Sequence, residues 1–425
     1  MNRGFYTIMA AQFFSSVADN ALFVAAIELL KTSGAPEWQR AALVPMFAFF
    51  YVALAPFVGA IADRFPKGKV MFYANSIKVI GCLMMLFGSH PLLAYAIVGL
   101  GAAAYSPAKY GILTELLPPS QLVKANGWME GLTISSIILG VVLGGQLIGR
   151  KVSDSLLQID IPRFETGIDT APEVAISCLI FIYIIAALFN LRIPRTNAAL
   201  MALPHNLLDL VKDFRDCNAR LWQDKLGQIS LATTTLFWGA GGNLRYIVLA
   251  WAATALHYST TQASSLVGVV AIGTALGAVL ASMKTRLESA TSVIPLGIAM
   301  GLVVVLMNFV DNLWIAVPFL IFLGGLGGYL VVPMNALLQH RGANLMGAGR
   351  SIAVQNFNEQ ACILVLGFFY SSLTTVGLGA GGAITIFGLV VAGFMFVIKR
   401  WHESNLINHA AEVNRLLDIC RAEKH

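Results

Sequence analysis

The sequence predicts an all-α membrane protein with twelve transmembrane helices in two pseudo-symmetric six-helix bundles. Three observations predict this fold class. Of the 425 residues, 57% are hydrophobic, only 12% are charged, and apolar stretches long enough to cross a bilayer follow one another along the chain. Soluble domains carry about a quarter of their residues as Asp, Glu, Lys or Arg, so an ordinary soluble enzyme is excluded.

The first predicted span contains Asp19 and Asn20 and no small-residue cleavage site, which favours a retained helix over a signal peptide. The predicted spans cover residues 5–30, 41–62, 69–88, 92–113, 124–148, 172–193, 226–256, 261–282, 292–310, 313–338, 350–376 and 378–399. An even number of spans puts both termini on one side of the membrane. Most of the 28 Lys and Arg residues fall on that side, so we expect both termini in the cytoplasm. The net charge of +6 is then a topology signal, and we expect no nucleic-acid partner.

This division predicts a bundle over residues 1–193, a linker over 194–225, a second bundle over 226–400 and a tail over 401–425. In the linker, apolar residues recur at helical spacing opposite charged residues, as in a helix that lies on a membrane surface. These apolar residues are Leu207, Leu208, Val211, Phe214 and Leu221. An equal alternative is that the linker is a plain tether between the bundles. The sequence of the tail predicts another short amphipathic helix.

The two halves resemble each other, which indicates a duplicated six-span unit. The matching landmarks are Asp19-Asn20 with Gly242-Asn243, Gly59-Ala60 with Gly277-Ala278, Pro107 with Pro333, and Glu130 with Glu359. A duplication of this kind favours two bundles that move relative to each other.

A basic turn joins the second and third spans. Its sequence, GAIADRFPKGK, carries Gly59, Asp63, Arg64, Lys67 and Gly68. We expect Gly59 to permit a close helix contact and Asp63 to meet the helix N-terminus at residues 349–351. That contact would hold the cytoplasmic face closed.

The cations of this turn, Arg64, Lys67 and Lys69, are expected to face the cytoplasm. The alternative is a turn that serves topology alone. In the second half, Ala281 stands where the Asp would be, so we expect only one such contact.

Asp19 and Asn20 fall near the middle of the first span, and Arg245 falls at comparable depth in the seventh. In proteins built from two such repeats, the first helix of each half lines a central cavity, so we expect Asp19 and Arg245 to face each other across it. The guanidinium would bind a phosphate diester through two hydrogen bonds, and Asp19 would hold that guanidinium or meet an ammonium group. A permanent salt bridge between the bundles is the alternative.

Further polar residues lie inside predicted spans. Lys109 and Glu130 are expected at similar depth, either as a structural ion pair or as substrate contacts. Lys78 allows the same two interpretations, although its long side chain could instead reach the membrane surface. The predicted substrate-binding residues are Asp19, Asn20, Lys109, Arg245, Asn335 and Gln355, with Lys78, Glu130 and Glu359 as secondary charged candidates. Asn335, Gln355 and Glu359 either bond neighbouring helices or face a wet cavity, and Glu359 is a candidate for titration.

Enzymatic function is not expected. The sequence has no glycine-rich phosphate loop, no HExxH pair and no nucleophile elbow, and its five Cys and seven His residues are dispersed. It therefore predicts no metal, no cofactor, no disulfide framework and no ATP-driven pumping.

Six segments together carry a family resemblance over residues 12–355. They are VADNALF, GAIADRFPKGK, GAAAYSPAKYGILTELLP, LVKANGWMEG, FWGAGGNLR and VVPMNALLQHRGANLMGAGRSIAVQN, of which SPAKY is the most specific. With these segments the chain resembles the bacterial lysophospholipid transporters, a branch of the major facilitator superfamily.

The resemblance implies two bundles in the bacterial inner membrane that flip lysophosphatidylethanolamine, lysophosphatidylglycerol and related lysophospholipids to the cytoplasmic leaflet by alternating access. A separate acyltransferase coupled to an acyl-carrier-protein synthetase would reacylate them there, and the transporter is expected to be a monomer. Asp19, Lys109 and Arg245 fall on the family's charged cavity positions. The predicted periplasmic loop, 149–171, departs from the family pattern and receives no functional interpretation.

The alternative function is a proton-coupled exporter of amphipathic drugs. Asp19, Glu130 or Glu359 would then be the protonation site.

Overall fold

The computed structural model describes residues 3–35, 37–157, 169–196, 198–202, 206–258 and 260–422. Within these residues every regular element is a helix, which confirms the predicted fold class. The first part of the chain forms α1 (Arg3–Thr32), α2 (Glu37–Ala53), α3 (Ala55–Arg64), α4 (Lys67–Leu86), α5 (Pro91–Leu116), α6 (Pro119–Ile148), α7 (Arg150–Leu157) and α8 (Ala171–Leu191). The second part forms α9 (Leu207–Gln223), α10 (Gly227–Ala255), α11 (Thr260–Lys284), η1 (Leu287–Val293), α12 (Ile294–Leu306), η2 (Met307–Phe309), α13 (Leu313–Met346), α14 (Ala348–Thr375), α15 (Ala380–Asn408) and α16 (Ala410–Ala422).

Each of the twelve predicted spans has a helical counterpart, but a count of twelve membrane crossings is not reached. In the described part of the chain, ten helices are long and apolar enough to cross a membrane, or eleven if α2 and α3 form one bent span. The bend of 67° lies at Leu54, where the ring of Pro56 prevents a continuous helix. The predicted seventh span, α10, is not among the ten, since Asn243, Arg245 and its run of threonines make it less apolar.

Two predicted amphipathic segments are helices, α9 in the linker and α16 in the tail. The prediction that the apolar face of α9 lies on a membrane surface stays a prediction. Leu210 and Leu221 are buried, whereas Leu208 and Val211 are exposed. The predicted loop over 149–171 contains the short helix α7 and includes residues 158–168, which lie outside the described part of the chain.

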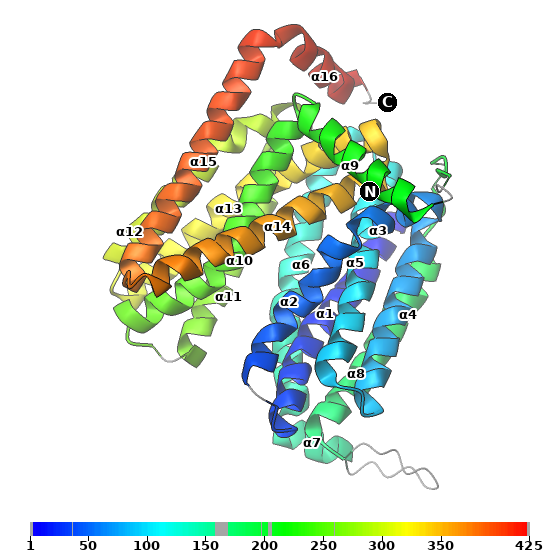
Figure 1. Ribbon diagram of the computed structural model, residues 1–425, viewed down its shortest axis with the longest axis vertical. Coiled ribbons are helices and arrows are strands. Elements are labelled where there is room, and N and C mark those ends of the chain that lie inside the picture. The colour runs from blue at the N-terminus through cyan, green and yellow to red at the C-terminus, as the bar shows by residue number, and fades with distance from the viewer. Residues whose placement is uncertain are drawn as a thin grey trace. The chain divides into compact units, whose positions relative to one another are not determined.

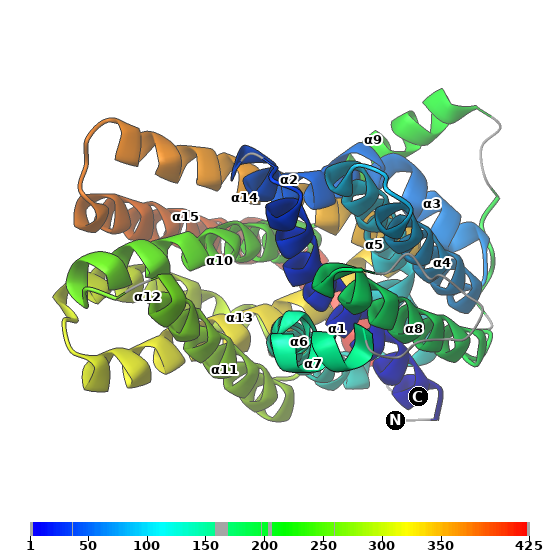
Figure 2. The ribbon, with the colours of Figure 1, turned by 90° about the horizontal axis from the view of Figure 1, so that it is seen from below.

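The chain forms two compact units. Unit 1 comprises residues 1–116, 135–214 and 348–353, and unit 2 comprises residues 117–134, 215–347 and 354–425. Both α6 and α14 therefore contribute residues to each unit. In unit 1, α1 packs on α8, and α4 packs on α5 and α8 (Figure 1). In unit 2, α11 packs on α13, and α12 packs on α15 (Figure 2).

The core of unit 1 contains many small side chains on one face of α1. Ala18, Ala21 and Ala25 are fully buried there, and they pack among Leu179 and Tyr183 of α8.

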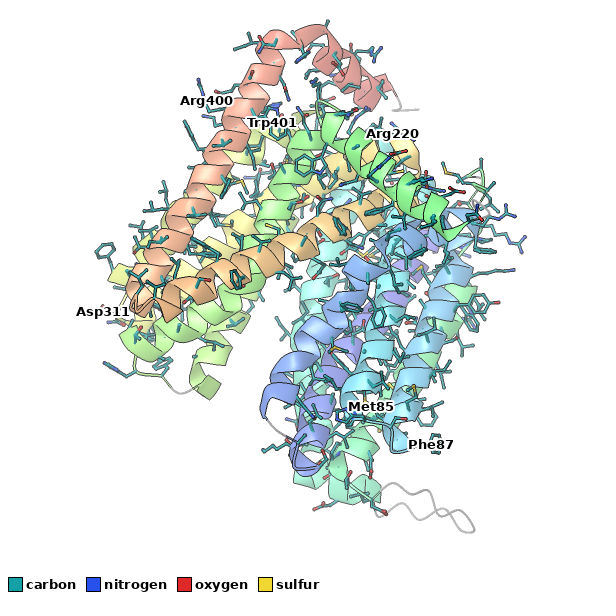
Figure 3. All side chains as sticks on the ribbon, in the orientation of Figure 1. Met85, Phe87, Arg220, Asp311, Arg400 and Trp401 are labelled. Atoms are coloured by element: carbon teal, nitrogen blue, oxygen red, sulfur yellow. The ribbon has the colours of Figure 1, made fainter. Side chains whose placement is uncertain are left out.

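Residues two positions apart can face opposite environments. At the end of α4, Met85 is buried, whereas Phe87, just after the helix, has 83% of its surface exposed (Figure 3). Exposed apolar rings of this kind are expected where lipid replaces water as the solvent.

Glycines permit the close contact between α11 and α13. A Cβ atom on Gly277 would overlap the backbone of Gly325, and one on Gly328 would overlap the carbonyl oxygen of Thr274. The glycines of α13 therefore serve close helix contact.

Gly328→Ala should destabilise the protein by about 1–3 kcal/mol, because the added methyl group has no room against the α11 backbone. The measurement is the thermal unfolding temperature of the detergent-solubilised protein. Gly393→Ala in α15 is the matched control, since a Cβ at that position meets nothing within 4 Å. Equal unfolding temperatures for the two variants would contradict the packing argument.

Candidate functional site

Asp63, at the end of α3, accepts hydrogen bonds from the first turn of α14, and both partners belong to unit 1. The Gly349 amide donates to Oδ1 at 2.6 Å, and the Arg350 amide donates to Oδ2 at 2.9 Å. The Asp63 side chain is 4% exposed. A carboxylate at a helix N-terminus is stabilised by the unpaired amides and by the helix dipole. The predicted contact of Asp63 with residues 349–351 is confirmed.

Cations surround the same carboxylate. Lys67 Nζ lies 3.4 Å from Oδ1, and Arg350 Nη1 lies 3.4 Å from Oδ2. Lys67 also donates to the Ala62 carbonyl oxygen at 2.9 Å and lies 2.6 Å from Glu115 Oε1. We name this set, Asp63, Lys67, Glu115, Gly349 and Arg350, the Asp63 latch.

The prediction that Lys67 faces the cytoplasm is wrong, because its side chain is only 4% exposed. Two carboxylates, from Asp63 and Glu115, neutralise it inside the protein. The neighbouring Arg64 and Lys69 are exposed, as expected. The pattern of basic residues in the turn gave no indication that the middle cation would be buried.

Gly59 is required by the same contact. A Cβ at this position would lie 2.7 Å from the Ala353 Cβ atom and 3.0 Å from the Arg350 Cα atom. A Cβ on Gly349 would lie 2.7 Å from the Gly59 carbonyl oxygen. Gly68 has a similar role between α4 and α8, where a Cβ would lie 2.8 Å from the Asn190 carbonyl oxygen. Gly59 and Gly349 allow the backbones of α3 and α14 to approach closely enough for Asp63 to reach the amides.

The linker helix adds a partner to the latch that sequence patterns did not reveal. Asp213 of α9 accepts a hydrogen bond from Arg350 Nε at 2.7 Å. Arg350 thus lies between two carboxylates of unit 1, those of Asp63 and Asp213.

A second buried group of charges lies among α1, α4, α5 and α8 of unit 1. Lys78 Nζ lies 2.7 Å from Asp19 Oδ2 and donates to Ser15 Oγ at 3.0 Å. The Tyr183 hydroxyl donates to Asp19 Oδ1 at 2.7 Å. The Lys78 ammonium also lies 5.1 Å from the centre of the Tyr105 ring, within range of a cation–π interaction.

Lys78 therefore does not reach the membrane surface. Its side chain is 1% exposed, whereas that of Asp19 is 21% exposed. Because an isolated charge inside a bundle is costly, the pair stabilises both side chains. The alternative that treated Lys78 as reaching the surface is wrong, and a buried partner for Asp19 was missed because the two residues are 59 positions apart.

Other predicted site residues lie elsewhere. Asn20 donates to the Ser16 carbonyl oxygen of its own helix at 2.8 Å. The Lys109 ammonium lies 4.3 Å from the centre of the Tyr110 ring. The side chain of Arg245, on α10, lies outside the described residues. The predicted pairs of Asp19 with Arg245 and of Lys109 with Glu130 each join unit 1 to unit 2 and stay predictions.

Unit 2 contains a chain of buried polar side chains, which we name the polar ladder. Asn335 Nδ2 donates to Glu130 Oε1 at 3.4 Å, and Gln355 Nε2 donates to Asn335 Oδ1 at 3.0 Å. Gln355 Nε2 also donates to Glu359 Oε1 at 2.7 Å. These four residues come from α6, α13 and α14, so the ladder bonds three helices. Gln355 Oε1 has no hydrogen-bond partner although it is buried.

One turn from the ladder, Asn126 and Gln339 form two reciprocal hydrogen bonds of 2.9 Å between α6 and α13. At the end of α13, Arg341 donates from Nη2 to Asp224 Oδ2 at 2.6 Å and from Nε to Oδ1 at 3.2 Å. Asp224 Oδ1 also accepts from the Gly227 amide, at the start of α10, at 2.7 Å. This pair has no signal in the sequence, because a cation at the end of a span is normally a topology signal.

Comparisons with known proteins identify the family. A family model described as Major Facilitator Superfamily matches residues 8–359. The lysophospholipid transporter LplT of Escherichia coli O9:H4 (strain HS) is 39% identical over 407 residues, which cover 94% of this chain and 97% of that protein. The chain belongs to the LplT family of the major facilitator superfamily. LplT of Pectobacterium carotovorum subsp. carotovorum (strain PC1) is 40% identical over 378 residues, which cover 89% of this chain and 88% of that protein.

Solved structures confirm the fold of this LplT family member. The human organic anion transporter MFSD10 (TETRAN) has a TM-score of 0.73 at 13% identity, covering 94% of this chain and 100% of that one. The transporter FucP in its outward conformation has a TM-score of 0.70 at 14% identity, and the match covers 94% of this chain and 98% of that one. With its family and its apolar helices, the chain is a multi-pass membrane protein.

Asp63→Asn should weaken the Asp63 latch, because it removes the negative charge that attracts the α14 N-terminus, Lys67 and Arg350. The interaction of a carboxylate with a helix N-terminus is worth about 0.3–2 kcal/mol. The measurement is maleimide labelling of Ser351→Cys in a background without the native cysteines, since Ser351 is 1% exposed. Labelling should become several-fold faster. Asp209→Asn, at an exposed position of α9, is the control, and an unchanged labelling rate in Asp63→Asn would contradict the role of Asp63.

Proposed function

We propose that this protein carries lysophospholipids across the bacterial inner membrane to the cytoplasmic leaflet by alternating access. One observation carries the proposal: relatives named lysophospholipid transporter LplT are 39% and 40% identical and match over 97% and 88% of their own lengths. The same relatives favour this function over the export of amphipathic drugs. Transport without chemical conversion agrees with the family, so no enzymatic step is proposed.

The substrate has a polar headgroup with a phosphate diester and a single acyl chain. We propose that Arg245 binds the phosphate, because a guanidinium presents two parallel donors to its oxygens. The glycines at 239, 241 and 242, one to two turns before Arg245, support a role for this part of α10 in movement. Lys109, Asn20, Asn335 and Gln355 would line the path of the headgroup, and the acyl chain would remain against apolar side chains.

Alternating access requires the bundles over 1–193 and 226–400 to move relative to each other. In this proposal the Asp63 latch holds the cytoplasmic side closed. Its opening would separate Asp63 from the α14 amides and expose the buried Lys67. The carboxylates of Glu115 and Asp213 would then keep Lys67 and Arg350 paired, which limits the free energy of the open state.

The cytoplasmic side would also be where the product is used. The excess of Lys and Arg supports cytoplasmic termini, and the linker and the tail would lie on the same side. A separate acyltransferase coupled to an acyl-carrier-protein synthetase would reacylate the lysolipid there. Each monomer would contain a complete transport path.

Arg245→Ala should abolish transport without abolishing folding, because the phosphate loses its two donors while alanine, a strong helix former, is compatible with α10. The test is uptake of labelled lysophosphatidylethanolamine into proteoliposomes, with and without a proton or sodium gradient. Asp19→Asn is measured alongside and should also reduce uptake. Normal uptake by well-folded Arg245→Ala protein would remove Arg245 from the site, and failure of the wild type would overturn the proposed function.

A further inference from the structure

The Lys78 and Asp19 pair is a buried, fully bonded group of charges in the described part of unit 1. Lys78 Nζ contacts Asp19 Oδ2 at 2.7 Å and Ser15 Oγ at 3.0 Å, and it lies 5.1 Å and 5.6 Å from the ring centres of Tyr105 and Tyr183. Asp19 Oδ1 receives the Tyr183 hydroxyl at 2.7 Å. Both carboxylate oxygens therefore already have donors, and one of them has a cation.

The environment of the Lys78 ammonium has the chemistry that recognises a lipid amine. A carboxylate, a hydroxyl and two aromatic faces are the groups that bind organic ammonium ions. In this structure they hold an ammonium from the protein itself. Asp19 is consequently not a free anion waiting for a substrate cation.

The exposure of the pair strengthens this argument. Only the Asp19 end is accessible, at 21%, whereas Lys78 is 1% exposed. A headgroup ammonium that took Asp19 for itself would leave Lys78 charged and unpaired inside the bundle, which is strongly unfavourable. An approaching headgroup instead meets a neutral pair, which attracts neither an amine nor an anion.

We propose that Lys78 is a specificity-determining residue that neutralises Asp19, so that transport does not depend on an amine in the headgroup. The inference rests on the proposed function and assigns to Lys78 the acceptance of both kinds of headgroup that the family resemblance implies. Lysophosphatidylethanolamine carries an ammonium and a phosphate, whereas lysophosphatidylglycerol carries the phosphate alone. The protein should accept both, because recognition depends on the phosphate that the two lipids share.

The test is the ratio of initial uptake rates of the two lipids in proteoliposomes of one composition, at a mildly alkaline pH where carboxylates are ionised. In the wild type the ratio should lie within about threefold of one. In Lys78→Met the unpaired Asp19 should favour lysophosphatidylethanolamine by about tenfold or more, since one unscreened charge contact is sufficient for that discrimination. Lys31→Met is the matched control, because Lys31 is an exposed lysine of α1 with 63% of its side chain accessible.

A double variant keeps the test decisive if Lys78→Met fails to fold. Asp19→Asn with Lys78→Met removes both charges and leaves no unpaired ion. Its ratio should match that of the wild type even if its absolute rate is lower. Selective loss of lysophosphatidylethanolamine uptake in this variant would make Asp19 an amine receptor and overturn the proposal.

The two proposals fail in different ways. If the wild type transports neither lipid, the proposed function is wrong. If the wild type transports lysophosphatidylethanolamine alone, the function stands and the inference about Lys78 is overturned. An unchanged ratio in folded Lys78→Met would overturn it as well.

Discussion

Charged and polar groups removed from water must be satisfied by one another, and this constraint organises both units of the protein. Lys78 and Asp19 form a neutral pair inside unit 1. Arg341 and Asp224 form a pair with two hydrogen bonds inside unit 2, with side chains 4% and 6% exposed. A missing partner in either pair would leave a charge in a medium that cannot solvate it, so each pair restricts which helices can be neighbours.

Helix N-termini provide a second way to satisfy buried acids. Asp63 accepts from the amides of Gly349 and Arg350 at the start of α14, and Asp224 accepts from the Gly227 amide at the start of α10. In both places an Arg side chain, Arg350 or Arg341, approaches the same carboxylate. The two contacts are therefore chemically similar, although only the first lies in the recognisable turn motif.

The second half has no acid at the sequence position that we matched to Asp63. Ala281 replaces the Asp, and next to it a Cβ on Gly127 of α6 would lie 3.2 Å from the Ala278 carbonyl oxygen. Gly127 permits a close contact between α6 and α11, and Ala281 supplies no carboxylate there. We expect this second contact to separate more easily than the Asp63 latch, since packing alone holds it.

The sequence by itself determined the fold class, the order of the helices and which polar and charged residues lie inside the apolar spans. Its apolar stretches have the length of a bilayer, and no tertiary information is needed to recognise them. It also predicted the contact of Asp63 with residues 349–351, because the turn GAIADRFPKGK fits a loop motif of the superfamily. The family followed from the same segments.

Only the tertiary structure decided which polar side chain meets which. Lys78 lies 59 positions from Asp19, and Gln355 lies 20 positions from Asn335, so neither pair has a local signal. Each span presents several polar residues at similar depth, and helix rotation selects among their possible partners. Rotation is set by the packing of many small residues at once, such as Ala18, Ala21 and Ala25 of α1, and that packing cannot be read from one helix alone.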